Sequence, residues 1–393
     1  MYSEDDINSA IAAGAISAEA AAGLRDHVSR VRALPRQSEE NFKLLNSFND
    51  VFVAVGIVIL LIAVGAIGQA LANFIVPDSW GGALPSGLSV EQLEQRTADR
   101  ALNAGLQVLL PGLFVAAAAW PLSEFFTRKR RMALPSILLL LAFVGGVFAC
   151  VFGLGMTVGM GLNERVVGAA MVILAGAFAA GAAYFHWRRF QVPITVAAGA
   201  GVTVISTLLA IAAFFQVEFD STGFYLAMLI TGLIVFAFAM RWDMTDRERI
   251  TRRSDVAFWL HLLAAPLIAH SIFAMIGVTE GRIDMGAAFS VLGMYVAFGL
   301  VALAIDRRAL LVSALAYVLF ALTFLFNEFG AVELGFALTA LIIGSALLSL
   351  SAFWQPIRAS VVAALPVGLR ARLPEPEAVA PVAPSAPPAA PAG

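Results

Sequence analysis

One charge-free stretch of the sequence, Val256 to Thr279, holds the side chains best suited to chemistry in an apolar environment. Pro266 lacks an N–H group and leaves the carbonyl of Leu262 without its helical partner, so we expect a kinked helix. His270 follows one turn later with Ser271 beside it, and histidine changes charge near neutral pH. These residues form a candidate site for a proton relay or for binding a polar ligand. In the alternative interpretation, His270 is a neutral imidazole that forms a hydrogen bond to a neighbouring helix.

A second histidine, His261, lies nine residues before His270 on the same predicted helix. At 3.6 residues per turn the two rings face opposite sides of that helix, so they do not form one bidentate metal site. We include His261 in the candidate polar site, although a structural role fits it better. Thr203, Ser206 and Thr207 form a weaker candidate in another apolar stretch, where small and hydroxylated residues usually mark close helix packing.

The sequence lacks the motifs that catalytic and metal-binding sites require. It contains no His-Glu-x-x-His, no Cys-x-x-Cys and no Gly-x-Ser-x-Gly motif, and its apolar stretches contain no pair of aspartates. Its four histidines, His27, His186, His261 and His270, are scattered over distant segments, and the two that share a helix, His261 and His270, face opposite sides of it. We therefore expect no catalytic residues, no bound metal and no cofactor, and we predict that the protein is not an enzyme.

The composition indicates a polytopic membrane protein. Of the 393 residues, 60% are hydrophobic and 13% are charged, and the mean hydropathy is +0.86. Soluble globular chains carry roughly 25% charged residues. The 25 basic and 27 acidic residues produce no net cationic field, which excludes a nucleic-acid-binding protein. The single cysteine, Cys150, excludes a disulfide scaffold.

We expect ten membrane-spanning helices in an all-α transmembrane helical bundle. A helix needs about 20 residues to cross roughly 30 Å of hydrocarbon, and ten stretches without Asp, Glu, Lys or Arg are long enough. The stretches are Val51 to Pro77, Ala101 to Ser123, Met132 to Asn163, Val166 to Trp187, Phe190 to Val217, Ser221 to Met240, Val256 to Thr279, Met285 to Ile305, Ala309 to Asn327, and Leu334 to Ile357.

Basic residues between these stretches predict the orientation, because positive residues are retained on the cytoplasmic side. With the N-terminus in the cytoplasm, 21 of the 25 basic residues fall in cytoplasmic segments. The alternation holds at every crossing, and an even number of spans places the C-terminus in the cytoplasm as well. About fifty mostly polar residues precede the first apolar stretch, so we expect that stretch to act as an internal signal that is not cleaved.

The chain divides into four predicted parts. These are a cytoplasmic N-terminal helical hairpin (1–50), the ten-helix transmembrane domain (51–357), a juxtamembrane amphipathic segment (358–373) and a disordered Pro/Ala-rich tail (374–393). In the hairpin, Gly14 ends the first helix and Ser17 caps the second. The longest loop between spans, residues 78–100, contains a helix capped by Ser89 that we interpret as a surface helix, with a lid as the alternative.

The N-terminal region resembles a known family. The residues Ile11-Ala-Ala-Gly14-Ala-Ile16-Ser17-Ala-Glu19-Ala20 lead through Leu24 towards the first span. They are similar to the N-terminal module of bacterial predicted membrane proteins in the domain-of-unknown-function 2157 class, where a short helix, a Gly-Ile-Ser turn and a second helix precede a multi-span region. Here Ala15 separates the glycine from the isoleucine, and the resemblance covers about the first 75 residues. It implies a location in the bacterial cytoplasmic (inner) membrane and no known activity.

Two function classes remain open. Ten spans permit two five-helix halves of opposite orientation, the layout of many secondary carriers. In each half the longest loop follows the first helix, at residues 78–100 outside and 241–255 inside, which favours a permease of a small uncharged or weakly charged solute. The alternative is a membrane-embedded scaffold or sensor that recruits cytoplasmic protein partners through its N-terminal helices. The lipid bilayer is a partner in either case.

Overall fold

The computed structural model describes residues 4–24, 48–76, 89–158, 164–247, 249, 251–278, 284–328 and 335–374. The chain divides into two compact units, one formed by Met1–Phe42 with Glu375–Gly393 and the other by Lys43–Pro374. Apart from Pro374, the predicted disordered tail lies outside the described residues.

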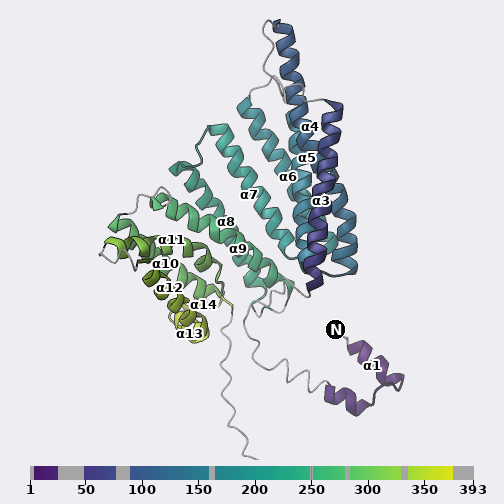
Figure 1. Ribbon diagram of the computed structural model, residues 1–393. Helices are drawn as coiled ribbons and strands as arrows, with labels where there is room; N and C mark the ends of the chain where they lie inside the picture. Colours follow the sequence, from purple (N-terminus) through teal and green to yellow (C-terminus); the bar gives the residue numbers. More distant parts are fainter. Residues whose placement is uncertain are drawn as a thin grey trace, which may run out of the picture. The chain divides into compact units, whose positions relative to one another are not determined.

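The N-terminal unit contains short helices where the sequence predicts them (Figure 1). Helix α1 spans Glu4–Ala12, and Gly14 follows with a φ of 69°, a left-handed conformation that favours glycine. Ser17 caps a second helix, described over residues 18–24, and its Oγ accepts a hydrogen bond from the N–H of Ala20 at 3.0 Å. The rest of the predicted second helix lies outside the described residues.

The described part of the larger unit is helical and contains no strand. Within it, nine helices are long and apolar enough to cross a membrane, and ten spans result if the bent pair α12–α13 counts as one. The helices are α3 (Phe48–Ile75), α4 (Val90–Ser123), α5 (Ala133–Val158), α6 (Glu164–Phe190), α7 (Ile194–Phe215), α8 (Thr222–Thr245), α9 (Arg252–Met275), α10 (Met285–Ile305), α11 (Ala309–Glu328), α12 (Gly335–Ala352), α13 (Trp354–Ala363) and α14 (Val367–Arg370). The predicted fold class, an all-α polytopic bundle, is confirmed.

Helices that follow one another in the sequence lie side by side through much of this unit (Figure 1). Helix α9 packs against α7, α8 and α11. It is also the most buried of the candidate spans. Pro266 lies inside α9 and does not interrupt it.

Glycines bring α4 and α5 into direct backbone contact. A Cβ atom on Gly112 would lie 2.7 Å from the carbonyl oxygen of Gly146, and a Cβ atom on Gly146 would lie 2.7 Å from that of Gly112. Gly105 and Gly153 form a similar contact two turns along the same pair of helices. Small residues allow this close approach, which is a common way for helices to associate in membranes.

Helix α4 is longer than the predicted span. The sequence predicts a separate surface helix after Ser89 and a span from Ala101, whereas the structure joins both in one helix of 34 residues (Figure 1). The predicted cap is present, because Ser89 Oγ accepts a hydrogen bond from the N–H of Gln92 at 3.2 Å. No glycine or proline stands between Val90 and Ala101, so nothing ends the helix there. At 1.5 Å per residue it is about 51 Å long.

The predicted tenth span, Leu334 to Ile357, is not a straight helix. Helices α12 and α13 meet at Phe353 and are bent by 75°. Pro356 lies in the first turn of α13, where a residue without an N–H is tolerated. In the interior of a longer α12, the same proline would remove a helical hydrogen bond. Helix α13 therefore begins at Trp354 and overlaps the start of the predicted amphipathic segment, residues 358–373.

Candidate functional site

A cluster of buried charged side chains lies where the end of α8 packs against α9. Asp243 in the last turn of α8 accepts a hydrogen bond from Arg307 Nη2 at 2.6 Å, and its other carboxylate oxygen lies 2.8 Å from His261 Nε2 in α9. Arg307, between α10 and α11, also donates to the carbonyl of Ser254 at 3.0 Å. The three side chains each expose 4% or less of their surface. We call Asp243, His261 and Arg307 the charged cluster.

A second aspartate shapes the turn that places His261 opposite Asp243. Asp246 Oδ2 accepts hydrogen bonds from the N–H of Thr251 at 3.0 Å, from Thr251 Oγ1 at 2.6 Å and from the N–H of Ser254 at 3.3 Å. Thr251 is the N-cap of α9. Because these bonds satisfy amides at the start of α9, they fix where that helix begins relative to the end of α8.

The side chain of Asp306 stabilises the turn that contains Arg307. Its Oδ2 accepts a hydrogen bond from Arg249 Nη1 at 2.8 Å, and its Oδ1 accepts one from Trp354 Nε1 at 2.7 Å. Arg249 Nη2 also donates to the carbonyl of Ile305 at 3.0 Å. Burial lowers the pKa of the Arg249 guanidinium and Arg307 lowers it further, whereas Asp306 raises it. Arginine nevertheless keeps its proton in proteins.

The C-terminal segment of this unit is fastened to the same turn. Arg358 Nε lies 3.6 Å from Asp306 Oδ1, and its Nη2 donates to the carbonyl of Pro374 at 2.7 Å. The Arg308 guanidinium lies 4.7 Å from the centre of the Trp354 ring, within range of a cation–π interaction. The end of the bundle that holds the charged cluster is therefore also the end at which α13 docks.

The charged cluster places a carboxylate between an imidazole and a guanidinium. Nδ1 of His261 is buried and has no hydrogen-bond partner among the described residues, so Asp243 is the group that orients this ring. An imidazole and a carboxylate in contact can exchange a proton. Ionisable side chains inside membrane-spanning helices are expensive to bury and are typical of ion or solute pathways.

The other histidine of the predicted polar site makes a different contact. His270 Nδ1 lies 2.6 Å from the hydroxyl of Tyr317 in α11, and the ring of Tyr225 from α8 packs edge-on at 5.9 Å. Ser271 Oγ donates to the carbonyl of Leu267 at 2.7 Å, within α9 itself. The structure therefore does not bring His270 and Ser271 into one polar site, and His261 belongs to the charged cluster instead.

The three weaker candidates in α7 bond within their own helix. Ser206 Oγ donates to the carbonyl of Val202 at 2.6 Å, and the hydroxyls of Thr203 and Thr207 each donate at 2.8 Å to the carbonyl four residues earlier. Ser206 is buried, and a Cβ atom on Gly176 of α6 would lie 2.2 Å from its Oγ. This geometry is typical of close helix packing.

The sequence analysis missed Asp243, Arg307 and Tyr317. The search for charge-free stretches ended the sixth span at Met240, and this assigned Asp243 to a loop, whereas α8 continues to Thr245. A signal was available, because residues 241–246 contain neither glycine nor proline that would end the helix. Tyr317 lies in an apolar stretch and carried no comparable signal.

The described residues contain no group of three or more His, Cys, Asp and Glu side chains that could hold a metal ion. A scan against protein-family models finds no match, and searches of curated proteins and of solved structures find none either. The resemblance of the N-terminal region to the domain-of-unknown-function 2157 class therefore stays a prediction. The long apolar helices identify a multi-pass membrane protein embedded in a lipid bilayer.

Proposed function

We propose that this membrane protein is a permease of a small solute and that the charged cluster is the site on which passage depends. The observation that carries the proposal is the burial of Asp243, His261 and Arg307 between helices of a membrane bundle. Burying an ion pair costs several kcal/mol of desolvation per ion, by order of magnitude, and apolar residues often stabilise a protein equally well. A purely structural contact therefore gains little from these three side chains.

Helix α9 makes a second polar contact further along its axis. His261 and His270 are nine residues apart, which is about 13.5 Å along a helix axis. The first contacts Asp243 in α8 and the second contacts Tyr317 in α11. The two contacts lie on opposite sides of α9, so they are separate polar points in the most buried candidate span and not one continuous path.

The proposal includes a location. With both termini in the cytoplasm, as the distribution of basic residues predicts, the charged cluster lies near the cytoplasmic face of a bacterial inner membrane. The histidine of the cluster then faces the side from which a proton or a solute is taken up or released. The expectation that the protein is not an enzyme is part of the same proposal.

Flux through reconstituted protein tests this function. Proteoliposomes that contain the full chain and a pH-sensitive dye are given gradients of small solutes, including polyols, sugars, amino acids and urea. We expect flux of at least one solute above that of empty vesicles, and we expect Asp243→Asn to reduce it to the empty-vesicle rate. Asparagine has nearly the same shape and accepts a hydrogen bond from Arg307, and size-exclusion chromatography with circular dichroism verifies that the variant is folded before its flux is compared.

Glu124→Gln is the matched control. Glu124 also pairs with an arginine, Arg189, at 2.6 Å, but both side chains are substantially exposed and lie outside the charged cluster. Its flux should equal that of the wild type. Equal flux in the wild type and in a folded Asp243→Asn variant would contradict the proposal, as would the absence of flux for every solute in the panel.

A scaffold or sensor is the second candidate, and one observation favours it. The first 42 residues fall in a unit separate from the helical bundle, as expected for a module that recruits a cytoplasmic protein. This function predicts no solute flux at all. It also predicts that deletion of residues 1–50 abolishes partner binding while the bundle still inserts into the membrane.

A further inference from the structure

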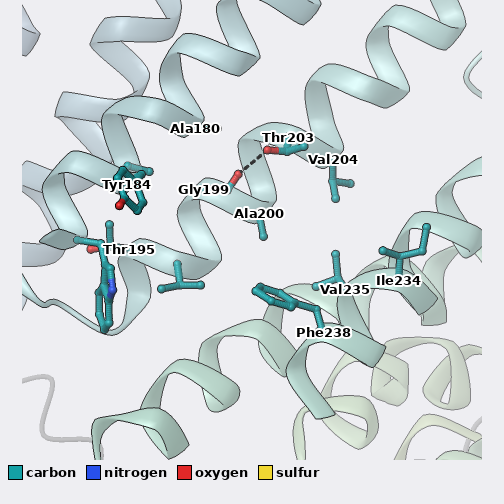
Figure 2. A pocket seen from close by; sticks show the side chains of 13 residues that line it. Ala180, Tyr184, Thr195, Gly199, Ala200, Thr203, Val204, Ile234, Val235 and Phe238 are labelled. Atoms are coloured by element: carbon teal, nitrogen blue, oxygen red, sulfur yellow. Dashed lines mark hydrogen bonds between the residues drawn. The ribbon is translucent and has the colours of Figure 1, made fainter. Parts of the chain in front are cut away.

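A hollow of about 380 Å³ opens between α6, α7 and α8 (Figure 2). Its walls are mainly apolar, and Ala200 and Val204 of α7 face Val235 and Phe238 of α8 across it. Aliphatic and aromatic side chains with few polar atoms form a surface suited to a hydrocarbon chain. We call this hollow the α6–α8 groove.

The groove has the depth of one membrane leaflet. Its lining residues in α7 run from Thr195, the second residue of that helix, to Val204. Nine residues of helix correspond to about 13.5 Å, which is close to half of the roughly 30 Å hydrocarbon thickness. The groove therefore extends from one end of α7 to about the middle of the bundle and does not cross it.

Arginines lie at the end of the groove that is nearest to the membrane surface. Arg188 Nη1 donates to the hydroxyl of Tyr184, a lining residue, at 3.1 Å. Arg252 Nη1 donates to the carbonyl of Gln191, in the turn between α6 and α7, at 3.5 Å. Arg241 follows the lining residue Phe238 by three residues, less than one turn of α8. All three arginines are exposed.

We propose that the α6–α8 groove binds an acyl chain of an anionic phospholipid whose phosphate contacts Arg188 and Arg252. The apolar walls match the acyl chain, and the arginines match the phosphate, which a guanidinium can bind through two parallel hydrogen bonds. Tyr184 and Trp187 line the groove near this end, at the depth where aromatic side chains meet lipid headgroups. With the predicted orientation, the lipid comes from the inner leaflet. This inference does not depend on a transport function.

Lipid retention on the intact protein tests the proposal. The full chain in detergent is titrated with phosphatidylglycerol or with phosphatidylcholine, and bound lipids are counted by native mass spectrometry. We expect one tightly bound phosphatidylglycerol molecule per protein and weaker binding of phosphatidylcholine. The double variant Arg188→Gln, Arg252→Gln should weaken phosphatidylglycerol binding about 25-fold, because each basic residue near an anionic surface contributes about fivefold. Its phosphatidylcholine binding should not change.

A second variant fills the groove without removing charge. Ala200→Phe should weaken the binding of both lipids, whereas Ile205→Phe, at an exposed position of α7 outside the groove, should leave it unchanged. Size-exclusion chromatography and circular dichroism verify that each variant is folded. Equal affinity for the two lipids in the wild type would overturn the proposal. Unchanged phosphatidylglycerol binding by the folded double-arginine variant would overturn it too, and this variant alters only exposed side chains.

Discussion

Helices are held together in opposite ways at the contact between α4 and α5 and at the charged cluster, where the end of α8 meets α9. Between α4 and α5, Gly112 and Gly146 remove side chains so that two backbones touch. At the other contact, Asp243, His261 and Arg307 insert charges that must be desolvated. The first contact is inexpensive and chemically inert. The second is costly, and under the proposed function the bundle keeps it for transport rather than for stability.

The largest expected change in stability comes from removing one partner of the charged cluster. Arg307→Met leaves Asp243 buried beside His261 without its guanidinium, so we expect a loss of about 3–5 kcal/mol in the free energy of unfolding. Denaturation in mixed detergent micelles, followed by circular dichroism, measures this loss. Arg128→Met is the control, because its ion pair with Glu124 is exposed and should contribute about 1 kcal/mol or less. Similar losses in both variants would remove the distinction between buried and exposed pairs.

Two adjacent glycines, Gly145 and Gly146, test the contact between α4 and α5. Gly146→Ala forces a methyl group to within 2.7 Å of the Gly112 carbonyl, so we expect a destabilisation of about 2 kcal/mol. Gly145→Ala meets nothing within 4 Å and should stabilise the helix slightly, since alanine is the better helix former. The same unfolding experiment compares the two. Equal stability of the two variants would mean that α4 and α5 separate easily.

The turn that carries Arg307 provides an intermediate case. Trp354→Phe keeps an aromatic ring beneath Arg308 but removes the indole N–H that donates to Asp306. A hydrogen bond to a charged group contributes about 1.5 kcal/mol or more, and we expect a loss of that size. Hydrogen exchange in α13 should increase at the same time, because the substitution loosens its docking. Unchanged exchange in α13 would show that the hydrogen bond from Trp354 to Asp306 does not hold the segment.

The smallest effect is expected at the contact between His270 and Tyr317. Tyr317→Phe removes the hydroxyl that contacts His270, and interhelical hydrogen bonds in membranes average about 0.6 kcal/mol. The unfolding free energy should therefore change by an amount near the limit of detection. A loss above about 2 kcal/mol would place this contact with the charged cluster rather than with ordinary helix packing.

The sequence predicted the helices well because the bilayer imposes a strong rule on them. Apolar stretches of sufficient length recur along the chain, and all but the last appear as unbroken helices. Helix ends were predicted less well, since charged residues were taken as boundaries. Helix α4 continues through the charged residues before Ala101, and α8 continues through Asp243, because hydrogen bonding along a helix is indifferent to whether the next side chain is charged.

The candidate site could be predicted only in part, for a related reason. His261 and His270 stand out in an apolar stretch, so their residue type alone marked them. Their partners come from other helices, and the packing of α8, α9 and α11 decides that Asp243 meets one and Tyr317 the other. The glycine contact of α4 with α5 likewise depends on which faces meet. A single sequence contains no direct record of such pairings.

One measurement tests the central claim most directly: stability and solute flux determined together for the triple variant Asp243→Leu, His261→Leu, Arg307→Leu. Replacing a whole buried ion cluster with apolar residues is often neutral or stabilising. We therefore expect an unfolding free energy equal to or above that of the wild type, with flux reduced to that of empty vesicles. A variant that is less stable but transports at the wild-type rate would contradict the account, because the charges would then serve the fold and not the function.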